Sequence, residues 1–286
     1  MKHAYLIAAH NQMGLLAELL KKLDDENNDI YLHLDIKCEN VDHDLLKKSI
    51  QKSQLYFIKR RSITWGDYSQ IQLEIDFLKE AVLKNYDYYH YISGVDYPIK
   101  SLREIDDFFQ KNNGKEFIHY DKTVDMSMIE YRIARYHIFQ KYLGRKRGIL
   151  DRIEKGLLLI QKILHINRIK NKRYEFKKGA NWFSITDDLA RYVVECEKQI
   201  KKMYSHSFCA DEIFLQTLVY NSHFRESLYF SDELGRYFNM RLVDWDRGEP
   251  YVYRKEDYDL LLKSKCLFAR KFSEMESKEL IQLLQN

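Results

Sequence analysis

The stretch YYHYISGVDYP at residues 88–98 decides the fold. Its first six residues, Tyr88–Ser93, are mostly large and apolar, which predicts a strand with little exposed surface. Gly94 and Pro98 then predict a turn, and Asp96 lies between them. The chain therefore leaves a strand through a turn that carries a carboxylate.

Strand and helix signals alternate on both sides of this stretch. Further strands are predicted at residues 4–9, 30–35, 54–58, 115–120 and 181–185. Leucine and isoleucine recur at helical spacing in residues 15–23 and 71–82, which predicts helices there. This alternation predicts an α/β fold, with a mainly parallel sheet flanked by helices.

Polar residues mark the predicted starts of later helices. Ser101 with Glu104, and Ser273 with Glu276, have the spacing of capping boxes. Asp211 is predicted to start a helix that runs through Val219. No linker rich in Pro, Gly or Ser interrupts the chain, so we expect one domain over residues 1–286.

Composition restricts the class of protein. The 286 residues are 45% hydrophobic and include two prolines, which is typical of a globular chain. The N-terminus lacks a signal-peptide pattern and no apolar run has the length of a membrane span, so we expect a cytoplasmic protein. The four cysteines share no metal-ligand spacing, and no zinc site is expected.

Positive charge is concentrated in one segment. Residues 141–178 contain thirteen Lys and Arg but three acids, a net charge of +10 in a chain whose formal charge is +4. Apolar residues at helical spacing within it predict a basic amphipathic helix, whose apolar residues are Ile149, Leu150, Ile153, Leu157, Ile160 and Leu164. Such a helix could lie on an anionic membrane, or its apolar face could pack on the domain. No nucleic-acid-binding motif accompanies it, so no nucleic-acid partner is expected.

Polar residues follow several predicted strands. His10, Asp35 and Asp96 all come at or just after strand ends, and open α/β sheets bind ligands beyond the carboxyl ends of their strands. The glycine-rich G-x-G-x-x-G and P-loop motifs are absent. Their absence argues against an NAD dehydrogenase and a P-loop kinase.

Two segments far apart in the chain carry opposite charges. The sequence CADEIF at residues 209–214 offers adjacent carboxylates, and LFARKF at residues 267–272 offers adjacent cations between phenylalanines. A carboxylate can act as a general base, and fixed cations can stabilise a leaving diphosphate. If the two segments meet, they suit a sugar-nucleotide transferase that needs no metal.

Five motifs together resemble those of the Core-2/I-branching β-1,6-N-acetylglucosaminyltransferase family, which includes the peptide O-xylosyltransferases. They occur in the family's order, covering roughly residues 5–272, and are HLDIK at 33–37, TWG at 64–66, YISGVDYPIK at 91–100, ADE at 210–212 and FARKF at 268–272. Residues 121–178 match nothing in the family. The short chain resembles a bacterial member, since it lacks the family's usual membrane anchor and cysteine pattern.

This resemblance implies a GT-A fold, a UDP-sugar donor and inversion at the anomeric carbon, without a divalent metal. Residues 1–120 would form the nucleotide-sugar half and residues 121–286 the acceptor and catalytic half. Glu212 would be the catalytic base, and Lys271 with Arg270 would stabilise the leaving UDP. Since neighbours on an extended segment point to opposite faces, Lys271 is the expected phosphate contact.

Other residues are assigned less directly. Donor recognition is predicted for His10, Asp35, Trp65, Asp96 and Arg241, in addition to Lys271. Acceptor contacts are predicted for Asp211, Trp182 and Trp245. Each has a plainer structural interpretation: a turn-forming aspartate, a core aromatic, or an acid at a helix N-terminus.

The resemblance and the charged segments together imply an inverting, metal-independent glycosyltransferase of surface-polysaccharide biosynthesis that acts on a glycan or lipid-linked glycan. We expect it in the cytoplasm, with a peripheral contact at the inner face of the cell membrane as one alternative. Two alternatives stay open. A metal-dependent transferase could use Asp96 or a downstream D-x-D triplet at 244–246 or 257–259. A non-catalytic nucleotide-sugar or glycan-binding protein could share the same fold.

Overall fold

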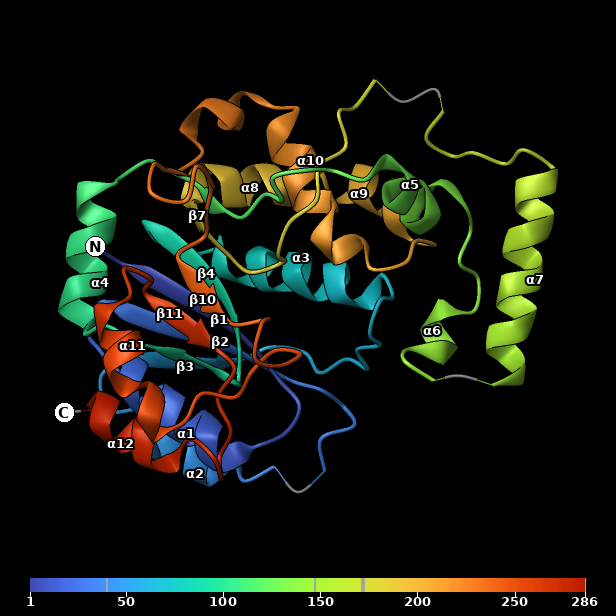
Figure 1. The fold of residues 1–286 in the computed structure, drawn as a ribbon. Helices are drawn as coiled ribbons and strands as arrows, with labels where there is room; N and C mark the ends of the chain where they lie inside the picture. Colours follow the sequence, from blue (N-terminus) through green and yellow to red (C-terminus); the bar gives the residue numbers. More distant parts are fainter. Residues whose placement is uncertain (40, 147, 171–172, 286) are drawn as a thin grey trace.

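A six-stranded mixed sheet forms the centre of the computed structural model, which describes residues 1–39, 41–146, 148–170 and 173–285 (Figure 1). The strands lie in the order β3–β2–β1–β4–β7–β6. Their bounds are β1 His3–Ala9, β2 Asn28–Leu34, β3 Gln54–Phe57, β4 Tyr88–Ser93, β6 Phe117–Ile118 and β7 Phe183–Thr186. The predicted α/β fold with a mixed sheet flanked by helices is confirmed.

Four of these strands, β1 to β4, are parallel, and the side chains of β1, β2 and β4 are almost all buried, whereas those of the edge strand β3 are partly exposed. β1 pairs with β2 and with β4, from His3↔Asn28 and His3↔Tyr88 onward. Successive side chains point to opposite faces, so Leu6 enters one core and Ile7 the other. Burial on both faces explains why the sequence of these strands shows continuous apolar runs rather than alternation.

Helices cover both faces of the sheet (Figure 1). One face is covered by α1 Met13–Leu23, α2 His43–Lys48, α4 Leu102–Lys111, α11 Tyr258–Lys263 and α12 Lys278–Gln285. The other is covered by α3 Ser69–Ala81, α8 Asp187–Glu195, α9 Glu197–Tyr204 and α10 Phe214–Tyr220. The short helix α5 Met126–Ile129 lies near α9, and α6 Gln140–Leu143 and α7 Ile149–Ile163 stand at the edge of the molecule.

The chain adds a smaller sheet beside the carboxyl end of β4. It consists of β5 Asp96–Pro98, β11 Phe268–Arg270 and β10 Arg241–Val243, with β11 in the middle. β5 and β11 are antiparallel, and Asp96 pairs with Arg270 in their register. The C-terminal cations are thus brought to the turn after β4. A separate hairpin joins β8 Phe230–Ser231 to β9 Arg236–Tyr237.

The structure corrects two predicted helix starts. The capping box at Ser101 and Glu104 is present, but α12 begins at Lys278, and Glu276 pairs with Arg254 instead of capping a helix. A short 3-10 turn, Ala210–Glu212, precedes α10, which starts only at Phe214. The competing tertiary contacts of these acids outweigh their local capping tendency.

None of the described helices is both long and apolar enough to cross a membrane. Within the basic segment 141–178, residues Arg147, Asn171 and Lys172 lie outside the described part of the chain.

Candidate active site

Three of the predicted donor residues, His10, Asp35 and Asp96, lie at one edge of the main sheet. β1 ends at Ala9 and β2 at Leu34, and these residues are in register. The amide of Asp35 donates a hydrogen bond to the Ala9 carbonyl over 3.0 Å, so His10 and Asp35 leave the sheet side by side. The turn after β4 reaches the same edge, where the amide of Gly94 bonds to the Ala8 carbonyl.

Asp96 is buried and already has three donors. Its carboxylate accepts hydrogen bonds from the Ser93 amide over 2.8 Å, from the Ser93 hydroxyl over 2.9 Å and from Arg270 Nη1 over 2.7 Å. The other side of Arg270 lies over the ring of Trp182, with 4.8 Å from the guanidinium carbon to the ring centroid. A permanent cation therefore occupies the space beside the carboxylate.

His10 lies among opposite charges on the same side of the site. Burial lowers its pKa, the carboxylate of Asp35 acts against that change, and the cations of Arg270 and Lys271 add to it. The half-buried Lys271 forms no ion pair with a carboxylate of the described residues. Its ammonium group is therefore a cation available to an anionic ligand.

The carboxylate of Asp35 is satisfied by backbone. It accepts from the amides of Lys37 over 2.9 Å and of Ile63 over 3.0 Å, which fastens the turn after β2 to the segment that leads to Trp65. This geometry shows Asp35 as a turn-forming aspartate, with one backbone amide on each of its carboxylate oxygens.

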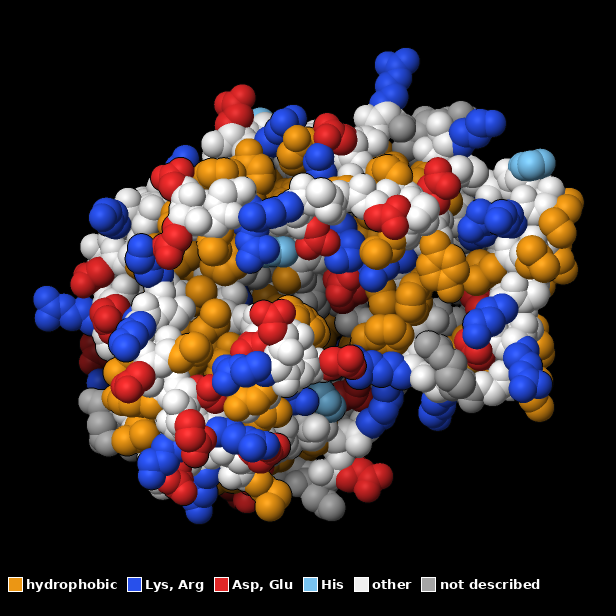
Figure 2. Space-filling model, in the orientation of Figure 1, with side chains coloured by type: hydrophobic (Ala, Val, Ile, Leu, Met, Phe, Trp, Pro, Cys, Tyr) orange, Lys and Arg blue, Asp and Glu red, His pale blue; other side chains and the backbone are white. Residues whose placement is uncertain are grey.

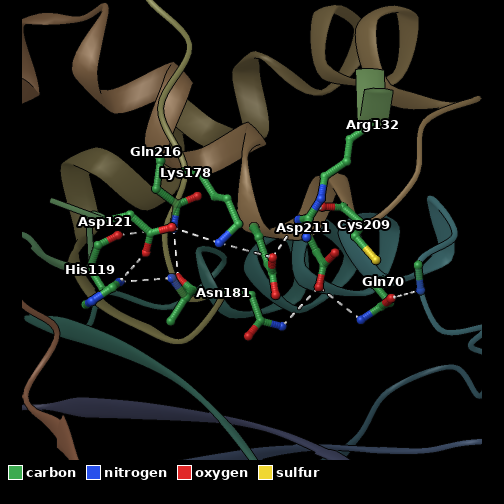
Figure 3. A network of polar contacts seen from close by, with 12 residues as sticks. Gln70, His119, Asp121, Arg132, Lys178, Asn181, Cys209, Asp211 and Gln216 are labelled. Atoms are coloured by element: carbon green, nitrogen blue, oxygen red, sulfur yellow. Dashed lines mark hydrogen bonds and ion pairs between the residues drawn. The ribbon is translucent and has the colours of Figure 1, made fainter. Parts of the chain in front are cut away.

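Glu212 presents its side chain at the surface between two cations. Arg132 Nη1 donates to Glu212 Oε2 over 2.6 Å, and Lys178 Nζ lies 3.6 Å from the same oxygen. Figure 3 shows Arg132 and Lys178 entering this network from opposite sides. The side chain is 37% exposed, and Oε1 has no donor among the described residues. One carboxylate oxygen is thus held while the other faces solvent.

Asp211 points the opposite way, into the protein. Its carboxylate accepts from Gln70 Nε2 over 3.0 Å and from Asn181 Nδ2 over 3.3 Å (Figure 3). Burial, and next the negative charge of Glu212, raise the pKa of Asp211 to about 7. The predicted acceptor contact therefore lies beneath the surface, where it holds the 210–212 turn in place.

A second acid lies beneath Asp211. Glu74 is one helical turn from Gln70 on α3 and is 1% exposed, and neither of its carboxylate oxygens has a hydrogen-bond partner in the described structure. Burial, and next the charge of Asp211, raise the pKa of Glu74 well above its usual value. Glu74 is therefore a neutral acid in the core under the site.

The carboxylate segment and the cation segment meet at Asn181 and Trp182. The Asn181 amide holds Asp211, and the adjacent Trp182 ring carries Arg270. Asn239 Nδ2 donates to the Trp182 carbonyl over 2.8 Å and fixes this short stretch before β7. The carboxylate segment at 209–214 thus contacts Asn181, and the cation segment at 267–272 contacts the neighbouring residue Trp182.

The remaining predicted residues are spread around this centre. Arg241 is buried, where it donates to the Ser184 hydroxyl over 2.8 Å and to the Phe183 carbonyl over 2.7 Å, and burial lowers its pKa to about 10. Arg241, which begins β10, is thus hydrogen-bonded to β7, and its burial leaves it little access to a phosphate. Trp65 is partly exposed beneath Arg145, and Trp245 is 66% exposed on the loop after β10.

The two D-x-D triplets are engaged in local structure. Asp244 accepts from the Asp246 and Arg247 amides, and Asp257 accepts from the Arg254 amide and from Arg247 Nη1. Among the described residues, no group of three His, Cys, Asp or Glu side chains could hold a metal ion.

Sequence reasoning missed four residues of the site. Arg132 and Lys178, which hold Glu212, come from the segment 121–178 that matches no family motif, and Gln70 and Asn181 hold Asp211. Lys178 lies just before the predicted strand at residues 181–185, and Asn181 is the first residue of that strand; this position is the one signal for them in the sequence. No sequence signal marks Arg132 as a site residue, because Arg132 reaches Glu212 only in the folded chain.

Asp211→Asn should change how stability depends on pH. The folded protein holds the Asp211 proton up to a pKa of about 7, against an ordinary value of 3.8, so the unfolded state ionises first. In the wild type, Asp211 therefore contributes fully to the free energy of unfolding below about pH 4, and this contribution is lost as the pH rises through 7. The variant should therefore gain about 1–4 kcal/mol of unfolding free energy relative to wild type between pH 4 and 8, as measured by urea unfolding.

The matched control is Asp107→Asn, because the Asp107 side chain is 67% exposed. Its stability should follow the wild-type curve across the same range. Parallel curves for Asp211→Asn and wild type would show that Asp211 is ionised in the folded protein throughout.

Comparisons with known proteins agree with this arrangement of motifs. Xylosyltransferase 2 of Rattus norvegicus is 23% identical over 305 residues, covering 98% of this chain and 33% of the relative. Xylosyltransferase sqv-6 of Caenorhabditis elegans is 24% identical over 268 residues, covering 86% of this chain and 31% of the relative. The chain thus spans about a third of the length of these curated relatives.

Two solved structures show weaker similarity. Mouse xyloside xylosyltransferase 1, in its apo form, aligns with 94% of this chain at a TM-score of 0.39 and 10% identity, and 96% of that chain is covered. Staphylococcus aureus TarS aligns with 46% of this chain at a TM-score of 0.31 and 13% identity, and 25% of that chain is covered. The family model described as Branch, Core-2/I-Branching enzyme, matches residues 3–260. Because that match extends over most of the sequence, this chain belongs to the Core-2/I-branching enzyme family.

Proposed function

We propose that this protein transfers a sugar from a UDP-sugar to a hydroxyl group of a glycan, with inversion and without a metal. One observation carries the proposal: Glu212 and Lys271 lie in segments on either side of Asn181–Trp182. Glu212 offers a free carboxylate oxygen and Lys271 a free ammonium group. A base and a phosphate cation on opposite sides are what an in-line displacement requires.

In the proposed reaction, the acceptor hydroxyl oxygen attacks the anomeric carbon of the donor sugar. The bond from that carbon to the β-phosphate oxygen breaks, and UDP leaves with the electron pair. Glu212 Oε1 takes the hydroxyl proton, while Arg132 and Lys178 hold Oε2 and keep the carboxylate oriented. These two cations act as positioning residues for the base.

Fixed cations would stabilise the charge that develops on the leaving diphosphate. Lys271 would supply an ammonium group that has no ion pair among the described residues, and Arg270 keeps part of its guanidinium on Asp96. The ion pair between Arg270 and Asp96 also supports the proposed independence from metal, because a cation already balances the one carboxylate of the turn after β4. The alternative of metal binding at Asp96 requires Arg270 to leave.

The donor sugar and the acceptor are proposed more broadly. The curated relatives are named xylosyltransferases, and the sequence motifs resemble those of N-acetylglucosaminyltransferases, so UDP-xylose and UDP-N-acetylglucosamine are the first donors to test. The exposed rings of Trp65 and Trp245 can stack on sugars. We propose a bacterial surface polysaccharide, carried on a lipid, as the acceptor.

UDP release from a panel of UDP-sugars, with EDTA and with added Mn²⁺, tests the reaction. Turnover of one donor that persists in EDTA is the expected result, since protein cations replace the metal. Turnover that EDTA abolishes and Mn²⁺ restores would favour the metal-dependent alternative. UDP-sugar binding without turnover on any glycan acceptor tried would favour a binding protein.

Glu212→Gln should lower kcat by about 10²–10⁴-fold, because the amide cannot take the hydroxyl proton. It keeps an oxygen for Arg132, so UDP affinity measured by calorimetry should change less than about twofold. Glu233→Gln is the matched control, since the side chain of Glu233 is 63% exposed and pairs with Lys265. Wild-type turnover in Glu212→Gln would remove Glu212 as the base.

Lys271→Ala should weaken UDP binding by about 1.5–3 kcal/mol, which is about 10–150-fold in Kd, because a charge-assisted contact to phosphate is lost. Lys263→Ala, an exposed lysine on α11, should bind UDP like wild type. Isothermal titration calorimetry measures both. An unchanged Kd in Lys271→Ala would place its ammonium group outside the donor site.

A further inference from the structure

Helix α7 is attached to the rest of the protein through its polar side chains. Gln161 accepts from the Tyr136 amide over 2.8 Å and donates to the Tyr136 carbonyl over 3.0 Å. Glu154 lies on the same face of the helix as Gln161. Its Oε2 accepts a hydrogen bond from the Phe139 amide over 3.2 Å, and its Oε1 lies 3.6 Å from His137 Nδ1. Both side chains are buried. Among the residues of α7 that the structure describes, Leu158, which lies between them, is the one apolar residue that is buried.

The apolar side chains of α7 face outward. The most exposed are Ile149 (78%), Ile163 (65%), Leu164 (64%), Leu159 (58%), Ile160 (52%) and Ile153 (47%). At 100° per residue these positions fall within one arc of the helix, away from Glu154 and Gln161. The alternative in which this apolar face packs on the domain is therefore wrong. The opposite face of α7, which carries Glu154 and Gln161, is the one that contacts the domain, through hydrogen bonds to residues 136–139.

Positive side chains border this stripe. Arg152, Lys155 and Lys162 are exposed on the flank of the helix between the stripe and the attached face, where Lys155 also pairs with Asp151. Figure 2 shows hydrophobic side chains along the outer edge of the molecule at α7, with Lys and Arg beside them. The segment 141–178 as a whole has a net charge of +10. The surface thus combines an apolar stripe with a cationic border.

An exposed aliphatic stripe of this length marks an interaction surface. A helix that belongs to a core hides its apolar face, whereas a helix that lies in a membrane interface presents it, with Lys and Arg on the flank. The cationic border specifies the occupant, because it complements phosphate headgroups and would repel a second copy of the same basic segment.

We propose that α7 docks this protein on an anionic lipid bilayer, with Ile149, Ile153, Ile160, Ile163 and Leu164 entering the interface. Lys155 and Lys162 would then meet lipid phosphates. The inference concerns where the protein works and does not depend on the donor sugar.

The docking surface is connected to the candidate active site. Gln140 on α6 donates to the Trp65 carbonyl over 2.8 Å, and the Arg145 guanidinium lies 5.0 Å from the Trp65 ring centroid. Residues 136–139, which hold α7, follow the turn that carries Arg132. A bilayer bound at α7 would therefore hold the site at a fixed position relative to a lipid-linked acceptor.

Vesicle flotation of the full chain tests the proposal. Wild type should float with vesicles of phosphatidylcholine and phosphatidylglycerol at about 7:3, and should not float with phosphatidylcholine alone. The triple variant Ile153→Ser, Ile160→Ser, Ile163→Ser should partition at least about tenfold less, because apolar burial in the interface is lost. Arg152→Gln, Lys155→Gln, Lys162→Gln should fall by at least about tenfold as well.

Matched controls use exposed residues elsewhere. Leu83→Ser with Met275→Ser removes two apolar side chains that are 79% and 88% exposed, and Lys201→Gln with Lys202→Gln removes two exposed cations of α9. Both should float like wild type. Circular dichroism melting and UDP release should be unchanged in all variants, so a failure of docking is separate from a failure of catalysis.

Several results would overturn the proposal. One is equal flotation with both kinds of vesicle, and another is wild-type flotation of the isoleucine variant. Absence of flotation in wild type would also overturn it. A dimer seen by analytical ultracentrifugation that the isoleucine variant dissociates, without any flotation, would assign the stripe to a second copy of the chain.

Discussion

The Arg270 guanidinium between the Asp96 carboxylate and the Trp182 ring joins three distant parts of the chain. Asp96 follows the central strand β4, Trp182 precedes the antiparallel strand β7, and Arg270 ends β11. A buried carboxylate without a cation would cost several kcal/mol, so this contact is strongly favoured once β5 and β11 pair. This contact links the small sheet, the end of β4 and the start of β7, and the hydrogen bonds of Arg241 to Ser184 and Phe183 link the small sheet to β7 a second time.

Buried polar side chains on either side of Trp182 connect further parts of the chain to this Arg270 contact. Asn181 holds Asp211 on one side of Trp182, and Arg241 clamps β7 to β10 on the other. Burial raises the pKa of both Asp211 and Glu74 in the core beneath the 210–212 turn, and Asp211 also accepts hydrogen bonds from Gln70 and Asn181. The turn leaves Glu212 at the surface.

The segment 121–178 differs in character from the parts that carry family motifs. It supplies Arg132 and Lys178 to Glu212, and it also supplies α7 with its outward isoleucines. One side of the site is therefore built from motif residues on the sheet edge, and the other from residues that no motif marks.

The sequence by itself determined the α/β class, the strands of the main sheet and the helix cap at Ser101, because apolar periodicity and capping are local properties. It also singled out the two charged segments. The tertiary structure alone decided that Asn181 and Trp182 bring them together, that Arg241 is a buried clamp, and that α12 begins after Glu276 rather than being capped by it. It decided the orientation of α7 as well, because two side-chain hydrogen-bond sets outweigh the usual inward turn of an apolar face. Local patterns fix which surfaces a segment offers, whereas the pairing of those surfaces depends on contacts between residues far apart in the chain.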